Sequence, residues 1–153
     1  FSYSHLYGLN TTGLRYFTVY GPWGRPDMAM YIFTKKILSD EQISVFNNGK
    51  MKRDFTFIDD IIDGTCAALD KNLSSEIFNL GNNKSEKLMD IIHIIENCLN
   101  KKAKIEFLPM QPGDVAQSFA DINDSHSQLN YYPKISINDG IPKFIDWYKK
   151  YHN

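Results

Sequence analysis

The sequence lacks several features that would place it in a familiar class of protein. No apolar run approaches the ~20 residues that a membrane-spanning helix needs, and no charged segment followed by an apolar one opens the chain as in a secretory signal. The 17 basic and 18 acidic residues are interspersed, so a net charge of −1 leaves no basic tract for a nucleic acid or a membrane surface. We therefore expect a cytoplasmic protein that binds neither.

Cysteine is also scarce. The two cysteines, Cys66 and Cys98, both fall at apolar positions of expected helices. We interpret them as buried thiols of a cytosolic protein, in preference to a disulfide or a metal-binding pair. No metal site is expected.

Glycine-rich phosphate-binding motifs are missing too. No G-x-G-x-x-G or G-x-x-G-x-x-G occurs, so no glycine turn follows a strand and opens a helix as a dinucleotide pyrophosphate requires. Tyr31 and Lys35 do match Tyr-x-x-x-Lys, and their i, i+4 spacing would put both on one helix face. This pattern is too short to be specific, and we assign it no catalytic role.

The chain contains enough hydrophobic residues to form the core of one domain. With 153 residues and 42% hydrophobic content it can bury roughly 68–70% of its unfolded surface. No repeat, low-complexity stretch or long linker divides it. Apolar periodicity predicts an α/β fold in which short strands alternate with helices. Strands are expected over 14–19, 43–46, 53–57, 76–80 and 104–108, and helices over 28–39 and from Asp59, Ser85, Asp121 and Ser136.

Two expectations concern how these elements pack. Residues 47–49, Asn-Asn-Gly, can reach positive φ, so they are expected to pair 53–57 antiparallel with 43–46. Asp59 is expected to cap a helix that buries one face. That face comprises Ile58, Ile61, Ile62, Thr65 and Leu69.

The most unusual stretch is residues 14–27. A strand of β-branched and aromatic residues runs there into a loop in which two glycines and two prolines forbid regular structure. The loop carries Tyr20, Trp23 and Arg25 where small polar turn residues would serve. Loops at strand ends are favoured places for ligand sites, although covering a core is the alternative role.

Two long motifs resemble the extended short-chain dehydrogenase/reductase family. They are Leu-Arg-Tyr-Phe-Thr-Val-Tyr-Gly-Pro-Trp-Gly-Arg-Pro-Asp-Met-Ala at 14–29 and Gly-Lys-Met-Lys-Arg-Asp-Phe-Thr-Phe-Ile-Asp-Asp-Ile at 49–61. Within the family the likeness is greatest to nucleotide-sugar epimerases acting on UDP-glucuronate. The resemblance implies that residues 1–153 are a single substrate-binding fragment, with 1–20 the tail of the nucleotide-binding lobe and 21–153 the carboxy-terminal substrate lobe.

The resemblance also implies an activity for the full-length protein. The family places a glycine-rich fingerprint and a catalytic Tyr-x-x-x-Lys upstream, so NAD would be bound mainly by a lobe absent here and the fragment alone would be inactive. The implied reaction oxidises the sugar transiently at C4 and reduces the ketone from its other face, which interconverts UDP-glucuronate and UDP-galacturonate. The full-length protein is expected to form a homodimer. The alternatives are another UDP- or dTDP-sugar epimerase, a 4,6-dehydratase, a decarboxylase and a non-catalytic sugar-nucleotide-binding module.

Several substrate contacts follow from the same resemblance. Arg53 matches the family arginine on the diphosphate, while Lys52 should face away from it because successive strand residues alternate. Ser44 and Phe46 match a strand that passes along the uracil, although a core role for Phe46 is as plausible. Asp114 follows Gly113 in a loop that could reach a ribose or uridine hydroxyl.

Thr18 and Arg25 match the positions that hold a uronate carboxylate in the glucuronate-type members. A guanidinium fork is the side chain best suited to a carboxylate, with a hydroxyl as an additional donor. Tyr16 and Val19 match positions beside the nicotinamide and would be the chain's contacts with the cofactor. Simple strand packing is their alternative role.

Overall fold

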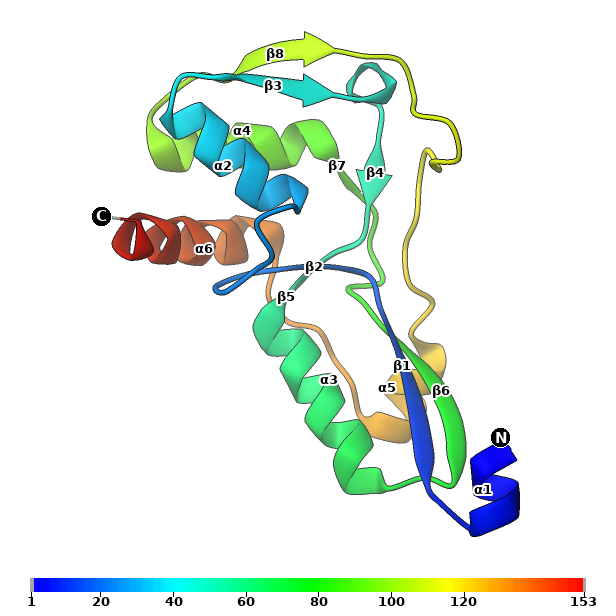
Figure 1. Ribbon diagram of the computed structural model, residues 1–153. Coiled ribbons are helices and arrows are strands. Elements are labelled where there is room, and N and C mark those ends of the chain that lie inside the picture. Colours follow the sequence, from blue (N-terminus) through cyan, green and yellow to red (C-terminus); the bar gives the residue numbers. More distant parts are fainter. Residues whose placement is uncertain (1, 153) are drawn as a thin grey trace.

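Six α-helices and eight short strands form the part of the chain that the computed structural model describes, residues 2–152 (Figure 1). The helices are α1 (Ser2–Tyr7), α2 (Ala29–Leu38), α3 (Ile58–Lys71), α4 (Leu88–Leu99), α5 (Asn123–Leu129) and α6 (Ile137–Tyr151). The strands are β1 (Thr11–Tyr16), β2 (Thr18–Tyr20), β3 (Gln42–Val45), β4 (Lys52–Arg53), β5 (Phe55–Phe57), β6 (Ser75–Leu80), β7 (Glu86–Lys87) and β8 (Lys104–Phe107). A mixed α/β architecture is thus confirmed.

Each strand pairs with a strand distant in the chain. β1 lies parallel to β6, β2 to β5 and β3 to β8, while β4 runs antiparallel to β7. The expected antiparallel pairing of 53–57 with 43–46 is therefore wrong. Asn47 and Asn48 both have left-handed φ values, of 52° and 49°, and form a short 3₁₀ turn that carries the chain away from β3. The free edge of β3 is taken by β8 instead.

The expected strand over 14–19 is in fact two strands that exchange partners at Phe17. The Phe17 amide donates to the Leu80 carbonyl at the end of β6, and the Thr18 amide donates to the Asp54 carbonyl beside β5. The exchange moves Thr18 from one strand pair to the next. It also joins the two ends of the molecule seen in Figure 1.

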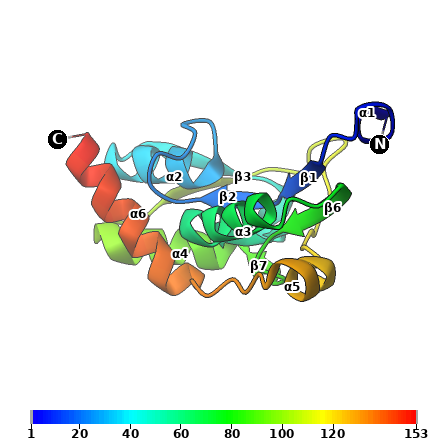
Figure 2. The same ribbon diagram turned by 90° about the horizontal axis from the view of Figure 1, so that it is seen from below.

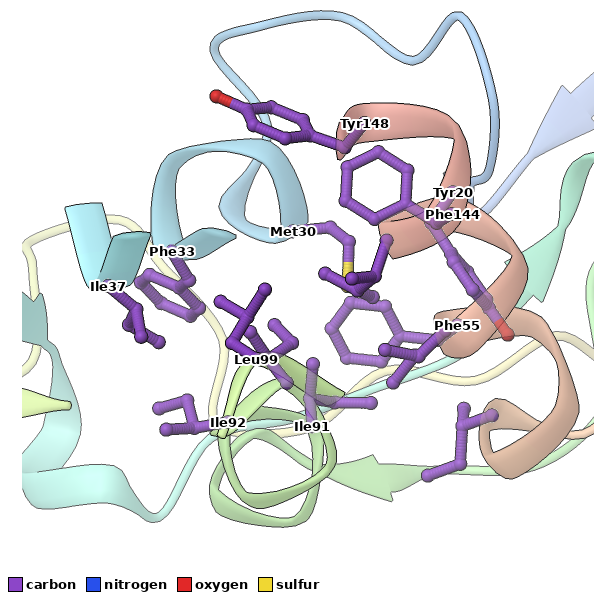
Figure 3. Packing of buried hydrophobic residues seen from close by; sticks show 14 of the residues in the cluster. Tyr20, Met30, Phe33, Ile37, Phe55, Ile91, Ile92, Leu99, Phe144 and Tyr148 are labelled. Atoms are coloured by element: carbon purple, nitrogen blue, oxygen red, sulfur yellow. The ribbon is translucent and has the colours of Figure 1, made fainter. Parts of the chain in front are cut away.

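Two hydrophobic clusters lie at those two ends. The larger packs α2, α4 and α6 around β3 and β5, with residues such as Phe33, Phe55 and Phe144 at its centre (Figure 3). The smaller lies between the β1–β6 pair, α3 and α5, where Phe78 and Leu80 are fully buried. Figure 2 shows α3 and α5 beside one another next to β6.

The buried face of α3 differs from the expected one. Ile61 is buried as expected, but Ile62 and Leu69 are exposed, and the remaining buried positions are Asp60, Gly64 and Ala68. Asp60 is tolerated inside because its carboxylate accepts the Lys134 and Ile135 amides at 3.0 Å each. No side chain caps this helix, so the capping role of Asp59 is also wrong.

The remaining helices follow the expectations more closely. Ser136 caps α6 by accepting the Asp139 amide. The helix buries apolar residues that recur at helical spacing, namely Ile137, Ile141, Phe144, Ile145 and Tyr148. The helix α4 begins at Leu88 rather than at Ser85, because Glu86 and Lys87 pair with β4. α5 begins at Asn123, with the Asp121 carboxylate accepting its amide.

The two cysteines are unpaired, and only Cys98 is partly buried. The expectation of a buried Cys66 is wrong, because Gly64 and Ala68 face inward from α3 and Cys66 lies between them. Burial raises the pKa of the Cys98 thiol. Within residues 2–152, no helix combines the length and the apolar character needed to cross a membrane.

Candidate functional site

A cleft of about 480 Å³ opens where β2, β3 and β4 meet the helix α2. Five of the six residues expected to contact substrate line it: Thr18, Ser44, Phe46, Arg53 and Asp114. They come from segments that are remote in sequence and are brought together by the strand pairings. Arg25 is the expected residue that does not line this cleft.

Arg53 is held in the cleft by two hydrogen bonds. Its Nη2 donates to Asp114 Oδ1 at 2.6 Å, and its Nη1 donates to the Lys52 carbonyl at 2.8 Å. The Arg53 side chain is only 19% exposed, yet these two bonds use a minority of the five N–H donors of its guanidinium. Lys52 does not line the cleft, as strand alternation predicts. A half-buried arginine with unused donors is therefore available to an anion.

Asp54, the residue after Arg53, organises the walls of the cleft. Its fully buried carboxylate accepts the Thr56 hydroxyl at 2.8 Å, the Asn82 amide at 2.7 Å and the Ala120 amide at 3.0 Å. The strand β5 is thereby joined to the turn after β6 and to the segment that follows Asp114. Gly81 must be a glycine, since a Cβ there would lie 2.4 Å from the Ala120 Cβ.

Arg25 lines a second cavity, of about 440 Å³, together with Tyr16 and Val19. Its Nε donates to Asp27 Oδ1 at 3.0 Å and its Nη2 to Asp27 Oδ2 at 2.5 Å. The bonded guanidinium lowers the pKa of the Asp27 carboxyl. Arg25 and Thr18, which were expected to act together, thus line two different cavities, and Arg25 is paired with Asp27.

The loop that carries Arg25 is attached to the last helix. Trp23 adopts a left-handed φ of 63° and packs against Trp147 and Tyr151 of α6, with ring centroids 5.4 and 5.2 Å away. A bulky side chain rarely accepts such a backbone conformation, so these contacts must offset its cost. They fix where the loop leaves β2.

The second cavity has mainly apolar walls. Its walls are mostly aromatic, aliphatic and glycine residues, with Arg25 as the one charged lining residue among those the structure describes. Such walls suit a flat nicotinamide ring beside Tyr16 and Val19. Residues 2–152 contain no glycine-rich turn between a strand and a helix that would cradle the diphosphate.

The Tyr31 and Lys35 pair is directed away from both cavities. The Tyr31 hydroxyl is hydrogen-bonded to His152 Nε2 at 2.6 Å, and Lys35 is exposed. Neither residue lines either cavity.

Sequence reasoning missed two charged residues of the cleft, Asp27 and Lys36. Lys36 donates to the Gln42 carbonyl at 3.1 Å and lies one helical turn after Ile32, which also lines the cleft. That i, i+4 relation on the expected helix over 28–39 could have identified it. The role of Asp27 depends on side-chain partners, which spacing does not reveal.

Comparison with known proteins identifies the family. The model of the NAD dependent epimerase/dehydratase family matches residues 1–81. The chain belongs to this family. It is 53% identical over 146 residues to an uncharacterised protein of Methanocaldococcus jannaschii, covering 95% of this chain and 45% of that one. It is 46% identical over 151 residues to the UDP-glucuronate 4-epimerase of Thermodesulfobacterium geofontis, covering 98% and 46%.

Among solved structures, the chain is similar to the UDP-glucuronic acid 4-epimerase from Bacillus cereus in complex with UDP-glucuronic acid and NAD. The TM-score is 0.91 at 39% identity, and the match covers 98% of this chain and 48% of that one. The chain therefore spans about half the length of the relatives it matches. The expected family and fold are confirmed, whereas the boundary at residue 20 and the roles of the site residues stay predictions.

Proposed function

We propose that the chain is the substrate-binding part of an NAD-dependent epimerase that interconverts UDP-glucuronate and UDP-galacturonate. The observation that carries the proposal is the convergence of Thr18, Ser44, Phe46, Arg53 and Asp114 on one cleft. A sugar nucleotide offers a flat base, a diphosphate and a polyol, which need an apolar wall, a fixed cation and convergent polar groups. The cleft contains all three.

Each part of the substrate then has a partner. Arg53 binds the diphosphate through the N–H groups not used by Asp114 and Lys52. The uracil lies along β3 against Phe46 and Ser44, which are both half-buried. Asp114 is 34% exposed and accepts a ribose hydroxyl with its remaining lone pairs.

The sugar carboxylate distinguishes a uronate from a neutral hexose. Thr18 at the start of β2 donates its hydroxyl from the cleft wall, and Arg25 supplies the guanidinium. Arg25 lies next to the cleft, because it is bonded to Asp27, which lines the cleft, and because Met28, three residues on, lines both cavities.

The cofactor would contact this chain only through its nicotinamide end, at Tyr16 and Val19. When bound, NAD supplies the reversible oxidation at the sugar C4. The chain contributes binding energy, orientation and exclusion of water, and its Tyr31 and Lys35 face neither cavity. We therefore propose that it is inactive without the remaining part of the protein.

The test is to incubate the full-length protein with NAD⁺ and either UDP-glucuronate or UDP-glucose and to follow the anomeric NMR signals. The proposal predicts formation of UDP-galacturonate from the first and no turnover of the second. Turnover of UDP-glucose alone would refute the uronate assignment. Turnover of neither would refute the proposed epimerase activity.

Arg25→Lys tests the carboxylate contact within the same protein. A point charge cannot reproduce a bidentate pair, so kcat/KM for UDP-glucuronate should fall about 10-fold or more. Arg15→Lys is the matched control, because Arg15 is exposed on β1 and lines neither cavity. Near-normal kinetics of Arg25→Lys would remove Arg25 from the site.

A further inference from the structure

The loop between β2 and α2 carries an ion pair that lies between the two cavities. Asp27 lines the substrate cleft together with Thr18, whereas Arg25 lines the second cavity. Both side chains are largely exposed, Arg25 to 73% and Asp27 to 64%. The position of Arg25 is therefore decided by its contact with Asp27 rather than by burial.

The geometry of this pair is that of a bound carboxylate. The Nε and Nη2 atoms of Arg25 donate to the two separate oxygens of Asp27, which is the fork arrangement a guanidinium offers to any carboxylate. Asp27 thus occupies an edge of Arg25 that a uronate would need. Exposed ion pairs contribute little net stability, so an incoming carboxylate can replace Asp27 at low cost.

We propose that Asp27 is a resident counter-ion of Arg25 that the substrate carboxylate displaces, and that it thereby sets the affinity for uronates. The inference rests on the proposed function. A carboxylate bound beside Thr18 shares the cleft with Asp27, so the two like charges compete for one guanidinium. A neutral sugar brings no replacement charge and leaves the pair intact.

The decisive variant is Asp27→Asn in the full-length protein with NAD⁺ at low ionic strength. Loss of the competing charge should lower KM for UDP-glucuronate roughly 5-fold, with kcat changed by less than about 2-fold. The inhibition constant of UDP-glucose, a competitor whose sugar carries no carboxylate, should stay within about 2-fold of the wild-type value. Asp27→Glu, which keeps the charge, should retain a KM near that of the wild type.

Two controls isolate the mechanism. Asp40→Asn removes an exposed carboxylate that is paired with Lys101, at 2.8 Å and outside both cavities, and should leave KM unchanged. In an Arg25→Gln background, Asp27→Asn should no longer lower KM, because there is no guanidinium to release.

A raised KM in Asp27→Asn would overturn the inference, since Asp27 would then position Arg25 for the substrate. An unchanged KM would overturn it as well. Failure of the proposed function is a separate result, because it appears in the wild type as no turnover of UDP-glucuronate.

Discussion

Replacing Asp54 by Asn tests the structural role of its carboxylate by exchanging one heavy atom, an oxygen for a nitrogen. The carboxylate is fully buried and accepts the Asn82 amide on Oδ1 and the Ala120 amide on Oδ2. An asparagine has one accepting oxygen and one NH₂ group, which cannot accept. Either orientation of the amide therefore leaves one backbone N–H facing another donor.

The expected loss of stability follows from the backbone N–H that has no acceptor. An unsatisfied buried polar group costs about 1–3 kcal/mol, and the opposed donors and lost charge-assisted bonds place Asp54→Asn near the upper end, roughly 3 kcal/mol. For a chain of this size, 1 kcal/mol shifts Tm by about 2–4 °C, so a decrease of roughly 6–12 °C is expected. The change should also weaken substrate binding, because Asp54 joins β5 to the segment that follows Asp114.

The assay is urea and thermal unfolding, monitored by tryptophan fluorescence, with the m value as a check that the unfolded state is unchanged. Asp40→Asn is the matched control: it makes the same chemical change on an exposed side chain and should change the free energy of unfolding far less than Asp54→Asn does. Equal losses of stability in the two variants would refute the assignment of Asp54 as the residue that ties the cleft walls together.

Two further variants probe the helical part of the fold. Ser136→Ala should destabilise the protein by about 1 kcal/mol, because the Asp139 amide loses its cap, and Tm would show a decrease of a few degrees. The Glu96 side chain is 11% exposed. Its burial raises the pKa of the carboxyl, but hydrogen bonds from the Ala103 amide and from Lys102 outweigh this effect and lower the pKa overall. The ionised Glu96 carboxylate therefore stabilises the fold above the pKa that this carboxyl has in the unfolded chain, and this stabilisation is lost as pH falls through the lowered pKa of the folded state. Glu96→Gln should then lose less stability on acidification than the wild type, as measured by urea midpoints at a series of pH values.

Local sequence patterns predicted the helices and caps that depend on interactions between residues close in sequence. The helix over 28–39 and the α6 face around Ile141 follow from apolar periodicity, and Ser136 follows from capping chemistry. Strand partners were not predictable in this way. β3 pairs with β8, and β4 with β7, through contacts between segments remote in sequence, which no short window contains.

Buried polar residues caused the other errors of the sequence analysis. Asp60 occupies an inward position of α3 because two amides from the segment before α6 satisfy it, so the apolar stripe was placed on the wrong side. The structural role of Asp54 was missed although it follows Arg53 directly, because the three groups that donate to its carboxylate come from three different segments. Periodicity treats a carboxylate as exposed, whereas tertiary hydrogen bonds decide otherwise.

The charge pairs of the candidate site were likewise not predictable from the sequence. The motifs drew attention to Arg53, which lines the cleft. They did not reveal that both proposed anion-binding arginines are already paired with a carboxylate, Arg53 with Asp114 and Arg25 with Asp27. The charged residues lining the cleft, Asp27, Lys36, Arg53 and Asp114, balance one another. Under the proposed function, a trianionic sugar nucleotide enters a neutral cleft, binds Arg53 through the N–H groups that Asp114 and Lys52 leave free, and replaces Asp27 at Arg25. Such exchange yields little affinity from charge alone and favours ligands whose anionic groups match both arginines, which is the discrimination that separates a uronate from a neutral hexose.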